Sequence, residues 1–176
     1  MIRELGLAER FETELLRLTR TENIRVVSAA ARALGEVGGQ IPGERLRQLL
    51  EHENARVRAN AAEALGRLRQ DSAIDRLATM ADRDEARPRA SAIAALLRHR
   101  PTRGLSALER MLQDRREAHR RSALWLIESS RLIDLNVRVV ETAVSDTDAA
   151  IRQRARLTLE SLMAGMRSSA ASAATV

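Results

Sequence analysis

The chain has no cysteine, no lysine and no tyrosine, and its 176 residues include one phenylalanine, Phe11, and one tryptophan, Trp125. The lack of cysteine excludes disulfides and thiolate metal sites. Because aromatic residues make up only 1% of the chain, a folded interior must be built from leucine, alanine, valine and isoleucine. Charged residues make up 31% and are interleaved with leucine, a composition that excludes a disordered chain.

Long apolar runs and recognisable catalytic motifs are also missing. No stretch approaches the roughly 20 apolar residues of a membrane helix, and the acid-containing N-terminus has no signal-peptide apolar region. There is no glycine-rich phosphate loop and no nucleophile elbow, and His52, His99 and His119 lack the spacing of zinc ligands. We therefore expect a cytoplasmic, non-catalytic protein without metal or cofactor.

An alanine-rich phrase returns along the chain at intervals of 31, 31, 31 and 32 residues. Its first copies read "IRVVSAAARALGEV" at 24–37, "ARVRANAAEALGRL" at 55–68 and "ARPRASAIAALLRH" at 86–99. Apolar residues recur within each copy at helical spacing, which predicts an amphipathic helix. When the copies are aligned, two positions hold only small or branched apolar residues, and we call each set of equivalent residues a column. The first column is Ala30, Ala61, Ala92, Ala123 and Ala155. The second column is Leu34, Leu65, Leu96, Ile127 and Leu159.

A second amphipathic phrase lies between successive copies, so that each repeat predicts a pair of helices. Its buried column is Leu15, Leu46, Leu77, Leu108 and Val140, and Asn23, Asn54 and Asp148 stand where N-caps of the alanine-rich helices belong. Helix pairs with such a period form solenoids, in which alanine lets neighbouring helices approach to about 8 Å. The predicted fold is therefore all-α, a right-handed α-solenoid of about five helix pairs over residues 1–165. The expected repeats are about 7–37, 43–68, 71–99, 103–129 and 132–165, followed by a disordered tail at 166–176.

The core phrases "VVSAAARALG" at 26–35 and "VRANAAEALG" at 57–66, with looser copies later, resemble HEAT repeats. The similarity is to the short type that also occurs in phycobilisome lyase-like proteins, and it covers about residues 7–165. HEAT repeats serve many unrelated tasks, so this resemblance implies an architecture more than a function.

HEAT repeats usually place an aspartate at the turn and an arginine early in the second helix. The resemblance therefore implies a ladder, that is, a series of charge-assisted bonds between these residues that joins successive layers. By position, Asp114 pairs with Arg120 and Asp146 with Arg152. Arg58 and Arg89 keep the arginine, and the acids close to them in sequence are Glu51, Glu53, Asp82 and Asp84.

In HEAT repeats the second helix of each pair lines a concave groove. On a helical wheel, the side chains opposite the buried stripe would then form the partner-binding surface. They are Arg25, Arg32, Arg56, Glu63, Arg67, Arg87, Arg98, Arg121 and Trp125, and the smaller Ser28, Ala59 and Ala90 are placed on the same side.

Trp125 and Leu157 occupy equivalent places in the last two copies. Two readings remain open: a small apolar binding patch, or coverage of the last layer by the segment "SLMAGM". Residues 83–121 hold eleven arginines against five acids, which equals the whole net charge of +6. This basic segment is either a binding region or a solvated surface held by salt bridges.

We expect a scaffold that binds another protein, one with an acidic surface, through this groove. The alternative is arginine-mediated nucleic-acid binding, although one tryptophan and no tyrosine offer little base stacking. A third reading is a lyase-type or glycosylase-type HEAT enzyme. No residues single out a tetrapyrrole pocket for a lyase, and a glycosylase would have only Trp125 and Glu63, two layers apart. A homo-oligomer and a place within a larger polypeptide are both compatible with the sequence.

Overall fold

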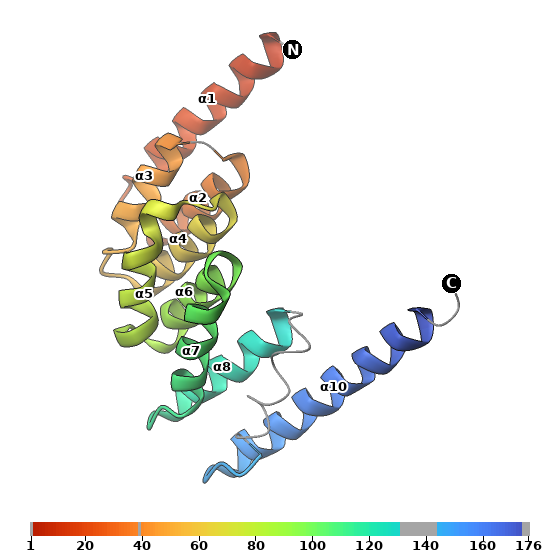
Figure 1. Ribbon diagram of the computed structural model, residues 1–176. Helices are drawn as coiled ribbons and strands as arrows, with labels where there is room; N and C mark the ends of the chain where they lie inside the picture. The colour runs from red at the N-terminus through yellow and green to blue at the C-terminus, as the bar shows by residue number, and fades with distance from the viewer. Residues whose placement is uncertain (1, 39, 131–143, 174–176) are drawn as a thin grey trace. The chain divides into compact units, whose positions relative to one another are not determined.

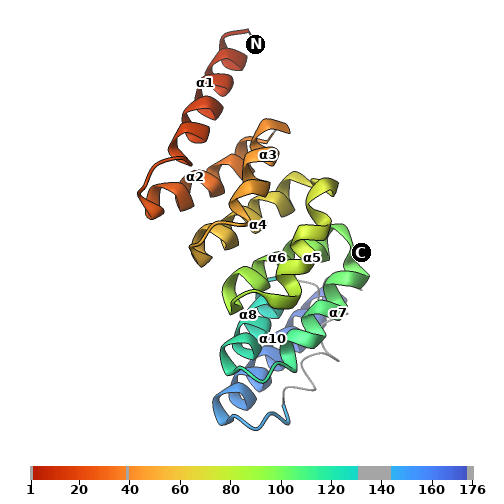
Figure 2. The same cartoon turned by 90° about the vertical axis from the view of Figure 1, so that its left-hand side faces the viewer.

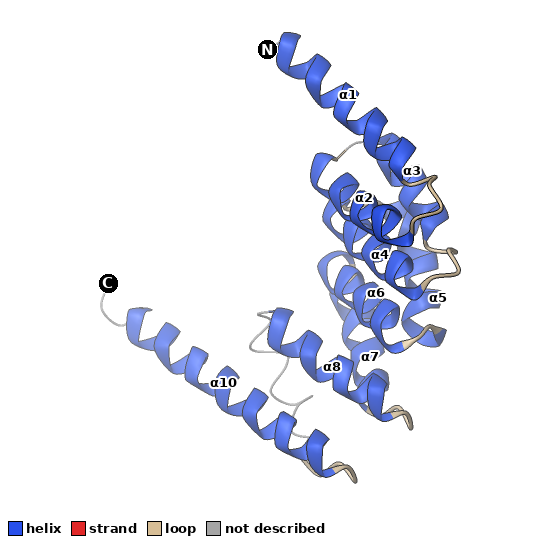
Figure 3. Ribbon diagram, turned by 180° about the vertical axis from the view of Figure 1, so that it is seen from behind, coloured by secondary structure: helices blue, strands red, loops and turns tan. Residues whose placement is uncertain are grey.

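A computed structural model describes residues 2–38, 40–130 and 144–173, and the regular elements in these ranges are all helices (Figure 3). The chain divides into two compact units, residues 1–107 and 108–176. No described helix is both long enough and apolar enough to cross a membrane.

The first unit consists of successive helix pairs. The pairs are α1 (Ile2–Leu18) with α2 (Ile24–Val37), α3 (Gln40–Leu49) with α4 (Ala55–Leu68), and α5 (Ile74–Arg83) with α6 (Ala86–His99). A short 3-10 turn, Asp71–Ala73, precedes α5, and α7 (Pro101–Leu112) spans the boundary between the two units. The second helices lie side by side, with α4 packed against both α2 and α6 (Figures 1 and 2). This confirms the predicted class, an all-α solenoid of HEAT-like helix pairs.

Side-chain caps start three of the alanine-rich helices at the predicted residues. The Asn23 side chain accepts hydrogen bonds from the backbone N–H groups of Arg25 (3.0 Å) and Val26, and Asn54 accepts one from Arg56 (3.0 Å). Asp148 does the same for α10 (Ala149–Ala173), where it accepts from Ala150 and Ile151. These bonds satisfy N–H groups that have no partner within the helix.

The repeated apolar columns form the core. All five alanines of the first column are at most 3% exposed. Leu34, Leu65, Leu96 and Ile127 are fully buried, and Leu159 is half-buried. In the column of the first helices, Leu46, Leu77 and Leu108 are fully buried and Leu15 is buried to 7% exposure, while Val140 lies outside the described residues.

The second helices approach one another closely where the repeat has glycine. A Cβ atom added to Gly35 would lie 2.5 Å from the Ala64 Cβ, and one added to Gly66 would lie 2.9 Å from the Ala95 Cβ. These distances are below normal carbon–carbon contact. The small residues therefore set the spacing between successive layers.

In the second unit, α8 (Glu117–Ser130) packs against α10. The helix α10 continues to Ala173, well beyond residue 165, where the sequence analysis ends the last repeat and expects a disordered tail. That expectation is corrected for residues 166–173. The reason is local: alanine and methionine favour helix, and the segment from Glu160 to Ala173 has one glycine and no proline.

Candidate protein-binding surfaces

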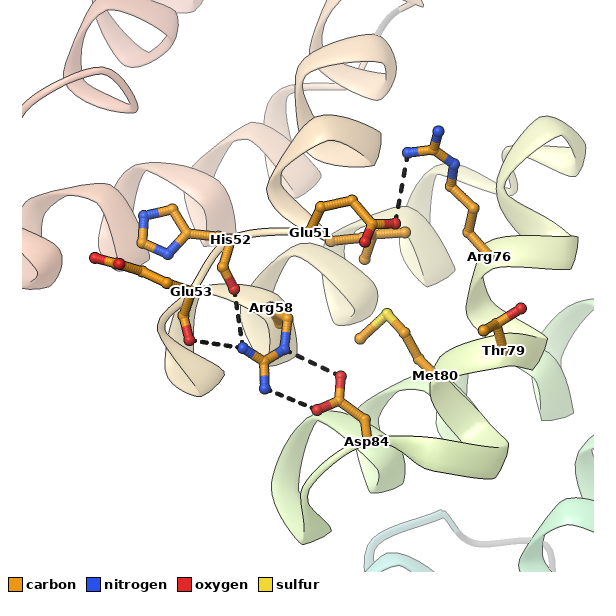
Figure 4. A pocket seen from close by; sticks show the side chains of 9 residues that line it. Glu51, His52, Glu53, Arg58, Arg76, Thr79, Met80 and Asp84 are labelled. Atoms are coloured by element: carbon orange, nitrogen blue, oxygen red, sulfur yellow. Dashed lines mark hydrogen bonds and ion pairs between the residues drawn. The ribbon is translucent and has the colours of Figure 1, made fainter.

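Arg58 joins the second repeat to the third. Its guanidinium donates to both carboxylate oxygens of Asp84, at 3.1 and 2.7 Å, and to the backbone carbonyls of His52 and Glu53, at 2.9 and 2.8 Å (Figure 4). The hydrogen bond with Asp84 raises the pKa of Arg58 above its ordinary value, although burial opposes it. A further bond to the Glu85 carboxylate at 3.0 Å brings the total to five charge-assisted bonds on a side chain that is 14% exposed, so Arg58 ties the two repeats together.

Arg120 repeats this arrangement in the second unit. It donates to both carboxylate oxygens of Asp146, at 2.6 and 3.0 Å, and to the carbonyl of Asp114 at 2.9 Å. Arg152 contacts the carbonyls of Asp146 and Thr147. The carboxylate partners of Arg58 and Arg120 thus each lie 26 residues later. The aspartate of the same turn contributes its backbone carbonyl to Arg120 and Arg152.

The remaining ladder residues take different contacts. The Asp114 carboxylate binds Arg116 at 2.9 Å, so the Asp114–Arg120 pair expected from the sequence exists only through the backbone. Arg89 is 4% exposed and donates its Nε–H to the carbonyl of Ala81 at 2.8 Å.

An open depression of about 420 Å³ lies beside Arg58, at the turns between the second and third repeats (Figure 4). No sequence pattern predicted this depression. The residues that line it include Leu50 and Met80 and the Glu51–Arg76 ion pair at 3.7 Å. Because Arg58 and Asp84 already bind each other, the polar centre of this depression is occupied by the ladder.

The predicted groove arginines of the first unit are exposed on α2, α4 and α6. Arg25, Arg32, Arg56, Arg87 and Arg98 have no side-chain hydrogen-bond or ion-pair partner among the residues that the structure describes. We call these five side chains the arginine face. The neighbouring Glu63 and Arg67 are paired with each other at 2.8 Å.

Three residues that the helical wheel places toward the groove are buried instead. Ser28, Ala59 and Ala90 are only 1–2% exposed. They lie where adjacent second helices meet, and the Asn60 side chain donates to both the hydroxyl and the carbonyl oxygen of Ser28, each at 2.8 Å. A wheel drawn for one helix misses this, because each inner helix is covered on both flanks by the next layers.

Arginine recurs at one register position of the first unit. Arg25, Arg56 and Arg87 are each the second residue of their helix, and the first turns of α2, α4 and α6 contain no acid. A cation at a helix N-terminus is unfavourable by about 0.3–1 kcal/mol. The corresponding residues in the second unit are Ala118 and Ala150. The repeat fold therefore does not require arginine at this position.

The second unit presents an exposed apolar pair. Trp125 on α8 is 58% exposed, and Leu157, at the equivalent place on α10, is 55% exposed. The reading in which the C-terminal segment covers Leu157 is therefore wrong. Arg121, one turn from Trp125, is paired with Glu117. A large exposed aromatic on one helix, with an exposed leucine at the equivalent place on the helix packed against it, is a candidate binding anchor.

The basic segment at 83–121 is largely held by ion pairs. Arg100 pairs with Asp71 at 3.3 Å, Arg103 with Asp75 at 3.4 Å, and Arg116 with Asp114 at 2.9 Å. These arginines are more than half exposed, so the pairs contribute little to stability. These paired arginines form the salt-bridged surface that the sequence allowed for. Arg87 and Arg98, on the arginine face, have no partner among the described residues.

The three histidines lie apart and make local contacts. His52 Nδ1 accepts from the N–H of Asn54, and His99 Nε2 lies 3.1 Å from the carbonyl oxygen of Gly66. His119 is 4% exposed, with Nδ1 3.9 Å from Asp114, a carboxylate neighbour that the sequence analysis did not foresee. Within the described ranges, no three His, Asp or Glu side chains gather as a metal site.

Comparison with known families identifies the repeats. The sequence profile of the HEAT repeats matches residues 13–98, which hold α2 to α5, nearly all of α6 and the end of α1. Residues 13–98 are HEAT repeats. No curated protein sequence matches the chain significantly.

Solved structures extend the likeness beyond the matched HEAT segment. A chain of the CpcE–CpcF complex of phycocyanin lyase from Nostoc has a TM-score of 0.63 and 21% identity, covering 84% of this chain and 96% of its own. YibA from Escherichia coli gives 0.62 and 21%, covering 89% of this chain and 62% of its own. A designed armadillo repeat protein bound to the peptide (KR)4 gives 0.51 and 18%, covering 92% and 85%. At these identities the likeness shows the fold alone.

Proposed function

We propose that this HEAT-repeat chain is a non-catalytic scaffold that binds an acidic protein partner through the arginine face. The observation that supports it is the exposure of five guanidiniums without partners, among the described residues, on three successive second helices. By contrast, Arg58 and Arg120 of the ladder and Arg100 of the basic segment are each paired with a carboxylate. An unpaired planar guanidinium is suited to bidentate recognition of a carboxylate.

Relatives with the same fold support a partner that is a protein or peptide. The CpcE–CpcF structure is a complex of two proteins, and the designed armadillo protein is seen with a basic peptide. This chain differs from that designed protein in the charge of the ligand it suits, because the exposed side chains of its second helices are cations. An acidic ligand is therefore the complementary choice.

The Trp125–Leu157 pair of the second unit offers a separate apolar contact for the same kind of partner. Arg121 supplies a polar neighbour, although Glu117 already holds it. Exposed tryptophan contributes more binding free energy than most interface residues when a partner covers it. We propose it as an auxiliary anchor.

An enzymatic role receives no support from the titratable groups. The pKa values that are shifted among the described residues belong to ion pairs, such as Glu14 with Arg17 and Asp146 with Arg120, or to the partly buried Arg45. None of these groups lies with others in an enclosed pocket of the kind that acid–base catalysis needs.

Nucleic-acid binding is the second candidate, and the same five exposed arginines favour it. The two proposed functions predict different affinities for acidic peptides and oligonucleotides, and a different dependence of those affinities on salt concentration. We would titrate the full chain with fluorescent polyglutamate, duplex DNA and single-stranded RNA, and follow anisotropy at low and at physiological salt.

The scaffold proposal predicts polyglutamate binding that weakens when Arg32 and Arg98 are both replaced by alanine, and oligonucleotide binding that is much weaker. Tight oligonucleotide binding with a steep loss of affinity at higher salt would instead favour the nucleic-acid reading. No binding of any probe at low salt would contradict both.

A further inference from the structure

We infer that Arg25, Arg56 and Arg87, which we call the arginine row, read an extended acidic peptide with one carboxylate at every third residue. This inference rests on the proposed function, since it specifies the ligand of the same face. It differs from that proposal in assigning a spacing, which a generally acidic partner would not need.

The first support is that the three arginines occupy equivalent positions of three repeats where a cation lowers the stability of the helix. Each arginine is exposed, is unpartnered in the described part of the chain, and occupies the second position of its helix. A residue type that works against the helix dipole at three equivalent places is not there to hold the fold. Its absence at Ala118 and Ala150 shows that the repeat forms without it.

The second support is the spacing of the helices that carry the row. Packed helices lie about 8–10 Å apart, and α2, α4 and α6 are packed directly on one another, with Gly35 against Ala64 and Gly66 against Ala95. Successive arginines of the row are therefore one helix spacing apart. Three residues of a polyproline II chain advance about 9.3 Å and complete one turn.

The match selects a peptide conformation as well as a charge. In a polyproline II helix every third side chain lies on the same face, so that three carboxylates meet three guanidiniums. In a β-strand, residues three apart point to opposite faces, so that at most alternate arginines are engaged. The row thus favours a Glu-x-x-Glu-x-x-Glu pattern in an extended, proline-compatible segment.

A peptide fits this face better than a nucleic acid does. The helices α2, α4 and α6 contain no phenylalanine, tyrosine or tryptophan, so bases have no aromatic surface on which to stack. The Glu63–Arg67 pair also lies on α4, where a continuous phosphate backbone would meet a carboxylate. A peptide with separated charges can avoid that contact.

The test uses two labelled nonapeptides of equal composition and charge, with anisotropy measured on the full chain at low salt. The spaced peptide repeats Glu-Pro-Pro three times, and the block peptide places all three glutamates before all six prolines. Arg56→Ala removes the middle of the row. Arg10→Ala, which removes another exposed and unpartnered arginine among the described residues, this one from α1, is the matched control. A single-stranded oligonucleotide is the third probe.

We expect the spaced peptide to bind about tenfold more tightly than the block peptide, and Arg56→Ala to weaken it about fivefold while Arg10→Ala has no effect. Equal binding of the two peptides, weakened by Arg56→Ala, overturns the spacing but leaves an acidic-partner scaffold. If Arg56→Ala and Arg10→Ala both bind the spaced peptide as tightly as wild type does, the arginine row is not the binding site. No binding of either peptide to the wild type overturns the proposed function too, and preferential oligonucleotide binding replaces it.

Discussion

Gly35 on α2 faces Ala64 on α4 so closely that a Cβ on the glycine would lie 2.5 Å from the alanine Cβ and 2.6 Å from its Cα. These two atoms are the Cα and the Cβ of Ala64, and neither can move away by a change of side-chain rotamer. The contact explains the glycine and alanine columns of the repeat: they let adjacent second helices touch nearly backbone to backbone.

Gly35→Ala is therefore expected to destabilise the first unit, although glycine-to-alanine changes inside helices usually stabilise by about 1 kcal/mol. Overpacking should reverse the sign and cost about 1–3 kcal/mol. Urea denaturation followed by circular dichroism measures it. Ala29→Gly, at an exposed position of the same helix, gives the intrinsic helix cost as a reference. A more stable Gly35→Ala protein would refute the close approach.

Two arginines on α4, two residues apart, should behave oppositely. Arg58→Ala removes five charge-assisted hydrogen bonds and leaves the Asp84 carboxylate without its cation, at a cost of about 2–3 kcal/mol. Arg56→Ala breaks no side-chain hydrogen bond or ion pair with any described residue and relieves an unfavourable dipole interaction, so stability should stay equal or rise by up to about 1 kcal/mol. Thermal unfolding of the two variants side by side provides the measurement. Similar losses in both would show that Arg56 has a structural role.

The Asp146–Arg120 pair should make the second unit acid-sensitive. Burial alone would raise the pKa of Asp146, but the hydrogen bonds from Arg120 and from the N–H of Asp148, with the nearby charges of Arg120 and Arg152, hold it below its ordinary 3.8. A lowered pKa in the folded state stabilises above the unfolded pKa, and this contribution is lost as the pH falls through the folded pKa.

Asp146→Asn should thus be less stable than wild type at about pH 7, and the difference should shrink below about pH 4. Trp125 fluorescence follows unfolding within the same unit. Asp148→Asn keeps an oxygen acceptor at the N-cap of α10 and serves as a control. A difference that does not change with pH would show that the pair does not titrate in this way.

Trp125 should matter for binding and not for folding. Because its side chain is 58% exposed, Trp125→Ala is expected to change stability by no more than about 0.5 kcal/mol. Leu124→Ala, one residue earlier and fully buried, should cost about 2–5 kcal/mol. If Trp125→Ala is as destabilising as Leu124→Ala, the indole is covered in solution and cannot serve as an anchor.

The core was predictable because it repeats. Ala61 and Leu65 are ambiguous in isolation, but their recurrence at 31 residues identifies a buried stripe, and the N-caps at Asn23 and Asn54 follow from the same register. The exposure of Arg56 and Trp125 followed from the helical wheel.

The contacts between layers were not predictable from one helix. Ser28, Ala59 and Ala90 were assigned to the surface because the wheel ignores the neighbouring second helices, yet the recurrence of small residues in this column could have revealed their burial. Likewise, the partner of Arg58 is Asp84 of the next repeat, whereas sequence proximity favoured the nearer Glu51 and Glu53.

The central claim is that the arginine row, the part of the arginine face at the helix N-termini, serves binding and contributes nothing to the fold. The most direct measurement combines urea denaturation and polyglutamate anisotropy on one preparation of the triple variant Arg25→Ala, Arg56→Ala and Arg87→Ala. We predict a free energy of unfolding equal to or above that of wild type and an affinity at least about tenfold weaker. A destabilised variant that still binds polyglutamate as wild type does would contradict the claim.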